Sequence, residues 1–349
     1  MKNKKVLVAI SGGVDSSVTA KILKTKGYEV MGVYFRLSKI RLFDESYARR
    51  VCNQIGIKLY PLNISQKFTK EVIEYFLDSY AQGYTPNPCI KCNKVIKFKE
   101  LIKLADVLGF DRVATGHYAR ILKNKDGSRS LLKGKDLSKD QSYFLYKLRE
   151  KDLERILLPL GDYYKKDVQK QARNKGLFFK DSESQDICFI NGDHNEFLKK
   201  YLDLTPGDIK DMSGKIVGKH EGLPLYTIGQ RKGINIGGGN PFYVVKMDQE
   251  NNILYVTDNR QEPELFSKKV EIKDLNQISD TDLDSTKTLE VVTRYGQTPQ
   301  KCLVKTSKDK KRGVLEFEEP QRAITPGQSA VIYDREKVLG GGIIQKRLS

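Results

Sequence analysis

The chain has 349 residues, of which 39% are hydrophobic and 30% charged, a balance that excludes disordered and membrane-embedded classes of protein. This length predicts two or three domains. The formal net charge is +18, and residues 1–260 carry most of it, with 46 Lys and Arg against 30 Asp and Glu, a net of +16.

From Lys4 to about Ala119, short apolar runs alternate with amphipathic helical stretches, the pattern of βαβ units. We expect strands at 5–10, 29–35, 57–63 and 111–118, with helices at 15–26, 44–55, 66–81 and 94–108 between them. Glycines at positions 27, 56 and 109 follow three of these helices, as C-terminal caps require. The fold class is therefore α/β, with a doubly wound parallel sheet that binds a nucleotide.

The rest of the chain changes pattern twice. Residues 119–134 predict a hairpin around positions 125–128, and residues 140–176 return to helical spacing. We place the end of the first domain at residue 192. The glycine-dense segment 205–245 predicts a small central β-rich domain, at 193–262, and the alternating runs that follow predict a C-terminal β-barrel, at 263–349.

The apolar run Val6–Ile10 is shorter than the core of a signal peptide, and no later run approaches the roughly 20 apolar residues of a membrane span. The five cysteines, at 52, 89, 92, 188 and 302, are an odd number in a chain too long to depend on disulfides. We therefore expect a soluble cytoplasmic protein. In that compartment a Cys-x-x-Cys pair suggests redox chemistry, a metal site or sulfur handling.

The positive charge favours a polyanionic partner, and nucleic acid is the commonest one for a soluble protein. The alternative explanation is an ordinary lysine-rich solvated surface.

A seven-residue motif, SGGVDSS at positions 11–17, lies between the first predicted strand and the first predicted helix. Its glycines let the backbone approach a phosphate closely. The hydroxyls and amides of Ser11, Ser16 and Ser17 can meet that phosphate at a helix N-terminus, where the dipole favours anions. Asp15 adds a carboxylate suited to magnesium or to orienting the loop. The alternative is a turn that is merely rich in glycine.

This motif lacks the lysine of the G-x-x-x-x-G-K-[ST] loop and resembles the PP-loop of the ATP pyrophosphatases. Those enzymes release pyrophosphate and transfer AMP to a substrate oxygen. Ligands of doubly wound sheets bind at the carboxyl ends of the strands. There we expect ATP to contact Ala9, Ile10, Ser11, Gly12, Gly13, Val14, Asp15, Ser16, Phe35 and Gly116.

A second motif, TPNPCIKCN at positions 85–93, contains the Cys-x-x-Cys pair. Its prolines stiffen the chain, and Asn93 can cap the helix that follows. Cys92 would then lie near a helix N-terminus beside two lysines, conditions that lower a thiol pKa and produce a nucleophile. The alternatives are an inert packed thiol and structural zinc, which lacks a second local ligand pair. Cys188 is the expected distant partner, whereas Cys52 and Cys302 are expected to pack.

Seven motifs occur in the order seen in the bacterial tRNA-specific 2-thiouridylases, which the chain resembles over nearly its whole length. They are SGGVDSS, TPNPCIKCNKVIKF, ATGHYAR, KDQSYFL, SQDICFI, GLPLYTIGQRKG and TPGQSAVIY. The resemblance implies a PP-loop domain, a small central domain and a C-terminal β-barrel. It also implies two cysteines on opposite sides of the reaction.

Carried over by position, the resemblance makes Cys92 the nucleophile and Cys188 the carrier of a persulfide sulfur. Asn87, Pro88 and Cys89 would flank the target base. Residues implied to contact tRNA, each of which could otherwise be a solvated polar side chain, are His117, Lys139, Asp140, Gln141, Arg294, Tyr295 and Gln328.

The implied reaction begins with ATP and Mg²⁺, which adenylate the 2-oxygen of the wobble uridine, position 34 of tRNA, and release pyrophosphate. Sulfur from Cys188 then reaches C2, directly or as hydrosulfide freed by Cys92, and AMP departs as the two cysteines form a disulfide. The implied partners are a tRNA anticodon loop, whose bases are accessible, and a persulfide donor such as a cysteine desulfurase or relay protein. The enzyme is expected to be a monomer.

The sequence departs from the family pattern at two places. Cys89 stands where the family often has aspartate, so Cys89, Cys92 and Cys188 are candidate ligands of an iron–sulfur cluster whose open iron could hold hydrosulfide. The simpler alternative keeps the persulfide route. The segment between Arg36 and Asp44 is also short, which weakens the assignment of Phe35 beside ATP.

Two other functions are consistent with part of the sequence. Another PP-loop enzyme, such as an amide ligase or a lysidine-forming tRNA enzyme, explains the loop and the charge without needing Cys92 or Cys188. A non-catalytic RNA-binding protein explains the charge and the barrel but gives no reason for the phosphate loop.

Overall fold

A computed structural model describes residues 4–37, 42–179, 187–234, 236–237, 241–279, 283 and 287–348. Its first sheet is parallel and has the order β3-β2-β1-β4-β7. The strands are β1 (Lys5–Ala9), β2 (Glu29–Arg36), β3 (Lys58–Asn63), β4 (Arg112–Ala114) and β7 (Ile156–Leu157). The order reverses beside β1, which confirms the doubly wound sheet and places the switch point between β1 and β4.

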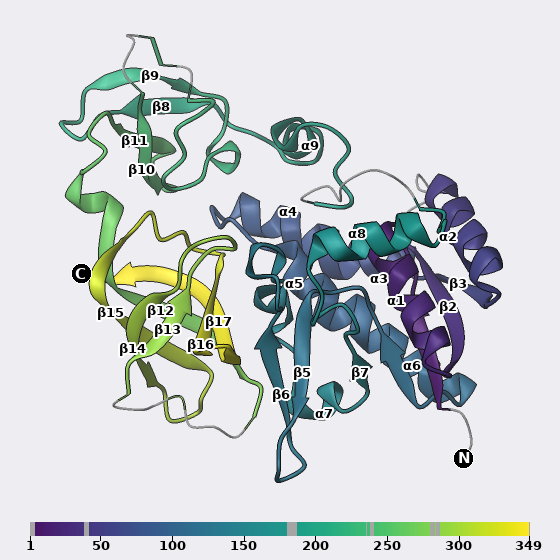
Figure 1. The fold of residues 1–349 in the computed structure, drawn as a ribbon. Helices are drawn as coiled ribbons and strands as arrows, with labels where there is room; N and C mark the ends of the chain where they lie inside the picture. Colours follow the sequence, from purple (N-terminus) through teal and green to yellow (C-terminus); the bar gives the residue numbers. More distant parts are fainter. Residues whose placement is uncertain are drawn as a thin grey trace.

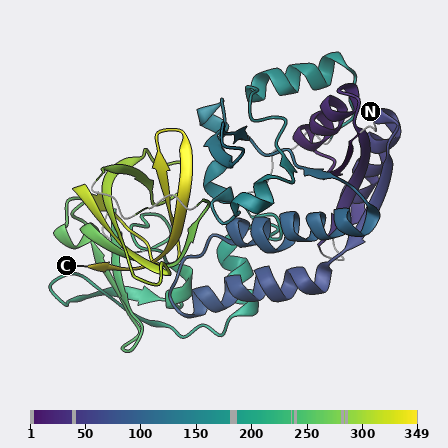
Figure 2. The same cartoon turned by 90° about the horizontal axis from the view of Figure 1, so that it is seen from below.

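Helices cover both faces of this sheet (Figures 1 and 2). Because side chains alternate along a strand, Leu7 packs on the face covered by α6 (Lys99–Leu108), whereas Val6 and Val8 pack on the other. That second face is covered by α1 (Val14–Thr25), α2 (Leu42–Ile55) and α8 (Lys165–Asn174). Two separate apolar cores therefore fix the sheet in place.

The helix predicted at 94–108 begins earlier than expected. It runs without a break through α5 (Pro88–Cys92), a π-helical stretch at Asn93–Phe98 and α6. Asn87 is the N-cap and Pro88 occupies the first turn, where its missing N–H costs nothing. The prediction that Asn93 caps the helix is therefore wrong, because Asn93 has helical backbone angles inside it.

A second long helix has the same construction, with α3 (Ser65–Phe68), a π-helical stretch at Thr69–Ile73 and α4 (Glu74–Ala81). The expected helical spacing over 140–176 is only partly correct. That region contains 3-10 turns at Leu137–Lys139 and Ser142–Leu145, then α7 (Glu150–Leu153), β7 and α8. Ile156 and Leu157, which were expected to be helical, form β7 and pair with β4. Pro159 follows two residues later and disfavours a helix there.

The C-terminal strands form a closed antiparallel barrel, as expected. Their order is β12-β15-β14-β13-β16-β17, and β12 also pairs with β17. The strands are β12 (Phe266–Gln277), β13 (Leu289–Val292), β14 (Gln300–Thr306), β15 (Arg312–Arg322), β16 (Ser329–Asp334) and β17 (Lys337–Leu348). The predicted hairpin, β5 (Ala119–Lys123) and β6 (Arg129–Lys133), extends this sheet because β6 pairs with β17.

The central part contains a four-stranded sheet in the order β10-β11-β8-β9. It is built from β8 (Gly207–Lys210), β9 (Ile216–His220), β10 (Tyr243–Asp248) and β11 (Ile253–Thr257), and α9 (His194–Tyr201) precedes it. The boundaries expected after residues 192 and 262 stay predictions. None of the described helices combines the length and apolar character needed to cross a bilayer.

Candidate functional site

The loop between β1 and α1 has the backbone of an anion site. Gly12 has a φ of 86°, which favours glycine, and Gly13 is the extended N-cap of α1. No side chain caps this helix, so the first N–H groups of α1 are available to a ligand. The N-terminus of a helix with vacant N–H groups suits a phosphate.

Serine hydroxyls hold this loop in shape. Ser16 Oγ donates to the carbonyl of Gly13 at 2.9 Å and accepts from the backbone N–H of Ser11 at 3.2 Å. Ser17 Oγ donates to the same Gly13 carbonyl at 2.9 Å. Ser16 and Ser17 are buried. The loop is therefore fixed by its own side chains before any ligand arrives.

Gly116 brings the loop after β4 against the start of α1. A Cβ atom at Gly116 would lie 3.0 Å from the carbonyl carbon of Asp15 and 3.1 Å from the nitrogen of Ser16. Both are backbone atoms, so a larger residue would push the two segments apart. Ala9 is the last residue of β1, Ile10 follows it, and Val14 begins α1.

Asp15 is held by two residues that the sequence reasoning missed. Lys165 Nζ donates to its two carboxylate oxygens at 2.7 and 2.6 Å, and the Tyr118 hydroxyl donates to Oδ1 at 2.7 Å. Burial, together with the negative charge of Asp15, raises the pKa of Tyr118 and keeps it a donor. Tyr118 lies within the ATGHYAR motif, whereas Lys165, the first residue of α8, belongs to none of the seven motifs.

These contacts bear on the two roles considered for Asp15. Both of its carboxylate oxygens accept hydrogen bonds from Lys165 or Tyr118, an arrangement that fits orientation of the loop.

The TPNPC segment is held where all three parts of the chain meet. The Thr85 N–H donates to the carbonyl of Pro326 at 2.9 Å, and Gln328 Nε2 donates to the Thr85 carbonyl at 2.9 Å. The Thr85 hydroxyl lies 3.1 Å from the Thr227 hydroxyl of the central part. Gln328, expected to contact tRNA, thus braces the segment that leads to Asn87 and Pro88.

Cys92 lies in an apolar cluster and is only 5% exposed. Its buried neighbours are Ile64, Phe68, Val72 and Ile96, and Cys188 packs against the same cluster. Burial raises the pKa of Cys92 to about 12, which outweighs the lowering effect of Lys97. The expected lowered pKa is therefore wrong, because burial of the thiol dominates over its basic neighbours.

Cys188 is half-buried. The next residue, Phe189, packs among three other aromatic side chains. The ring of Phe189 lies 5.8 Å from Phe68, 5.4 Å from Phe76 and 5.7 Å from Phe197. Phe35, at the carboxyl end of β2, also packs against the Cys92 cluster. The cysteine cluster therefore borders the sheet edge at which the phosphate loop lies.

Cys89 is half-buried in the first turn of α5, and its charge adds to the rise in the Cys92 pKa. Across the described ranges, no group of three or more His, Cys, Asp or Glu residues has the geometry to hold a metal ion. The Cys89, Cys92 and Cys188 set therefore does not fit an iron–sulfur cluster in this structure. None of the five cysteines forms a disulfide.

The other two cysteines are packing residues, as predicted. Cys52 is 1% exposed and Cys302 is fully buried. Burial raises the pKa of Cys52 to about 11 and that of Cys302 to about 12.

The Lys139–Gln141 segment combines one exposed cation with two residues that fix the loop. Lys139 is exposed. Asp140 Oδ1 accepts from the N–H of Gly134 at 2.8 Å, and Gln141 Oε1 accepts from the N–H of Tyr118 at 3.0 Å. Burial raises the pKa of Asp140. The segment is thus tied to the loop that holds Asp15.

His117 is buried, and its Nδ1 lies 2.7 Å from the Thr115 hydroxyl. Burial lowers its pKa well below the usual value, so the ring is neutral at pH 7. Arg294 and Tyr295, by contrast, are exposed on the barrel. The Tyr295 ring lies 4.4 Å from Phe144 of the first domain, which brings this part of the barrel to the same region.

Three family profiles cover most of the chain. The profile described as tRNA methyl transferase HUP domain matches residues 4–192. The tRNA methyl transferase PRC-barrel domain matches residues 195–258, and the aminomethyltransferase beta-barrel domain matches residues 267–344.

Curated relatives match the chain at nearly full length. A protein named tRNA-specific 2-thiouridylase MnmA from Carboxydothermus hydrogenoformans is 44% identical over 99% of this chain and 98% of its own length. Proteins of the same name are 44% identical in Halalkalibacterium halodurans, over 97% of this chain and 94% of that one, and 43% identical in Clostridioides difficile, over 99% of each. Their names specify thiolation, whereas two profile descriptions mention methyl transfer.

Proposed function

Because the chain belongs to the family of tRNA-specific 2-thiouridylases, we propose that it uses ATP to replace the 2-oxygen of a tRNA uridine with sulfur. It is then a tRNA-uridine 2-sulfurtransferase. One observation carries this conclusion: two cysteines distant in sequence, Cys92 and Cys188, pack into one cluster, which Phe35 joins from the carboxyl end of β2. Methyl transfer gives no reason for that pair.

The first half of the reaction takes place at the phosphate loop. The vacant N–H groups of α1 and the hydroxyls of Ser11 and Ser16 receive the phosphates of ATP. The uridine 2-oxygen attacks the α-phosphorus, which forms an adenylated base and releases pyrophosphate. Mg²⁺ bound with ATP would neutralise phosphate charge, held mainly by the phosphates and water. Lys165 and Tyr118 keep Asp15, and with it the loop, in place.

The second half of the reaction uses both cysteines. A persulfide on Cys188 supplies its outer sulfur to C2, the C2–O bond breaks and AMP leaves. The Cys92 thiolate then attacks the Cys188 sulfur, which frees 2-thiouridine and leaves a Cys92–Cys188 disulfide. In the alternative order, Cys92 attacks the persulfide first and liberates hydrosulfide, which attacks C2. Either order yields one disulfide, which an external thiol must reduce.

We assign the partners by the same chemistry. The target is the wobble uridine of an anticodon loop, because a base in a duplex is out of reach. Asn87, Pro88 and Cys89 would flank that base, and Lys139, Arg294 and Tyr295 supply exposed contacts for the RNA. The persulfide comes from a cysteine desulfurase or a relay protein. The enzyme works as a monomer in the cytoplasm.

The iron–sulfur variant requires Cys89 as a third ligand. Since the described residues provide no such ligand set, we propose the persulfide route. Anaerobic purification with iron and sulfide analysis should give a colourless protein, and Cys89→Asp should retain activity. A brown, iron-loaded enzyme that loses both colour and activity in Cys89→Asp, but not in a Cys302→Ala control, would overturn this choice.

The function is tested by mass spectrometry of tRNA nucleosides after incubation with ATP, tRNA and a persulfide source. We expect 2-thiouridine from the natural chain and none from Cys92→Ser or Cys188→Ser. Cys302→Ala and Cys52→Ala are matched controls that should retain the product. Activity that survives in both Cys92→Ser and Cys188→Ser would favour another PP-loop chemistry, such as amide or lysidine formation, which does not need the pair.

A further inference from the structure

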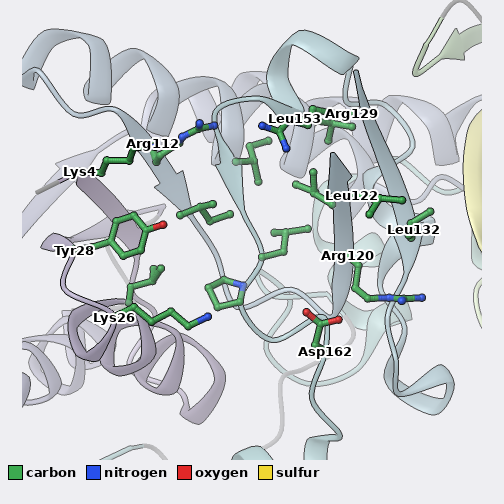
Figure 3. Close-up of a pocket in the computed structure, with 16 residues that line it drawn as sticks. Lys4, Lys26, Tyr28, Arg112, Arg120, Leu122, Arg129, Leu132, Leu153 and Asp162 are labelled. Carbon is green, nitrogen blue, oxygen red and sulfur yellow. The ribbon is translucent and has the colours of Figure 1, made fainter. Parts of the chain in front are cut away.

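A cleft opens beside the amino ends of β1 and β4, where Lys4 and Arg112 lie (Figure 3). It lies between the starts of β1 and β4, the turn from α1 to β2, the β5–β6 hairpin, and β7 with the segment that follows it, and has a volume of about 410 Å³. We call it the amino-edge cleft. Because β1 and β4 are parallel, this edge faces away from the proposed reaction, and the proposed function assigns it no role.

The rim of the amino-edge cleft is strongly basic. Five cations line it, and the only carboxylate among the described residues that line it is Asp162. Arg120 already donates to the Lys133 carbonyl and to Glu336. The other four have no ion pair within the described part of the chain; these side chains belong to Lys4, Lys26, Arg112 and Arg129. Unpaired cations around a concavity favour an anionic ligand.

The interior of the cleft is apolar. Leu122 on β5 is 51% exposed there, although large aliphatic side chains are usually buried. Leu132 of β6, Leu153 of α7 and Leu157 of β7 line the same space. A cluster of leucines inside a basic rim fits a ligand that carries both carboxylates and an apolar side chain.

We propose that the amino-edge cleft docks an acidic segment of a protein partner, with an aliphatic or aromatic side chain inserted over Leu122 and carboxylates against the four cations. Charge complementarity favours this occupant over a second copy of the chain, whose net charge of +18 opposes self-association. RNA is disfavoured because leucines give a phosphodiester backbone no partner. The proposal does not depend on which reaction the opposite edge catalyses.

A labelled acidic peptide tests this surface directly. The probe is a fluorescein-labelled peptide of about twelve residues, made of Glu, Asp and Leu, and its binding to the full chain is followed by fluorescence anisotropy at low salt. We expect saturable binding that weakens at least tenfold in the Arg112→Glu/Arg129→Glu variant and in Leu122→Glu. A peptide with Ser in place of Leu should also bind at least tenfold more weakly.

The matched control is Lys308→Glu/Lys311→Glu, which makes the same charge change at exposed positions of the barrel. It should bind the peptide as the natural chain does. Absence of saturable binding, or equal weakening in this control, would overturn the proposal. A larger loss of tRNA affinity than of peptide affinity in Arg112→Glu/Arg129→Glu would assign the cleft to RNA and overturn it as well. Thermal unfolding of each variant checks that the fold is intact.

Discussion

The phosphate loop and the cysteine cluster lie at the same edge of one sheet, yet they differ in polarity and in the protonation state of their functional groups. The loop is polar, fixed by serine hydroxyls and the Asp15 contacts, and has vacant N–H groups. The cluster is apolar, and burial raises the pKa of Cys92 to about 12. The loop is therefore organised in advance, whereas burial keeps the Cys92 thiol neutral in this structure.

The largest expected effect concerns the reactivity of Cys92. Its pKa is raised from 9.0 to about 12, so at pH 8 the neutral thiol dominates and the thiolate fraction falls about 1,000-fold below that of an unperturbed thiol. Alkylation by iodoacetamide, followed by peptide mass spectrometry, should be at least about tenfold slower than for an exposed thiol, because a more basic thiolate is also more nucleophilic and offsets part of the lower thiolate fraction. Raising the pH should speed it about tenfold per unit.

Addition of tRNA and ATP should accelerate alkylation of Cys92 if the cluster opens to react. Cys188, which is half-buried, is the internal comparison. If Cys92 in the enzyme alone is labelled as fast as an ordinary thiol, the proposed contrast between the phosphate loop and the buried cysteine cluster is wrong.

The next effect tests the phosphate loop. Asp15→Ala and Ser16→Ala should reduce AMP formation by at least about 100-fold, because each removes a group that shapes the anion site. The affinity for tRNA should stay nearly unchanged. Thr19→Ala, one turn along the same helix, is the matched control, since its hydroxyl donates only to the Asp15 carbonyl. Lost tRNA affinity with persistent AMP release would mean that the ATP site is misplaced.

The sequence was sufficient for the phosphate loop because its chemistry is local. Glycines, hydroxyls and a strand-to-helix turn act over seven residues, and the structure places them as such a turn requires. The partners of Asp15 could not be predicted in the same way. Lys165 reaches Asp15 only because α8 packs against α1, a tertiary contact with no local pattern.

The failure at Cys92 has a related cause. Neighbouring lysines and an expected helix start pointed to a lowered pKa, but the helix begins at Pro88 and the thiol points into an apolar cluster. Two residues that bury the Cys92 thiol come from a distant part of the chain: Phe68 lies in α3, and Ile64 is the residue just before that helix. The sequence around Cys92 could therefore not reveal its burial. Similarly, Gln328 looked like a surface polar residue, and only the packing of the barrel on Thr85 explains its contact.

The smallest expected effect concerns RNA affinity, to which many cations contribute. The affinity for tRNA should fall steeply with salt, with a log–log slope of roughly 0.7 to 0.9 for each phosphate neutralised. Lys139→Glu should weaken binding a few-fold, and more than Lys310→Glu on the barrel. Filter binding over a range of salt concentrations measures both quantities. A slope near zero would remove RNA as the reason for the net charge of +16 in residues 1–260.

The central claim is that Cys188 carries the sulfur and Cys92 releases it beside the phosphate loop. A single-turnover reaction tests it most directly, with enzyme persulfidated on Cys188, excess tRNA and ATP, and no external thiol. Quantitative mass spectrometry should find 2-thiouridine, AMP and a Cys92–Cys188 disulfide in equal amounts, one of each per enzyme. Formation of 2-thiouridine while Cys92 and Cys188 both remain reduced would contradict the account.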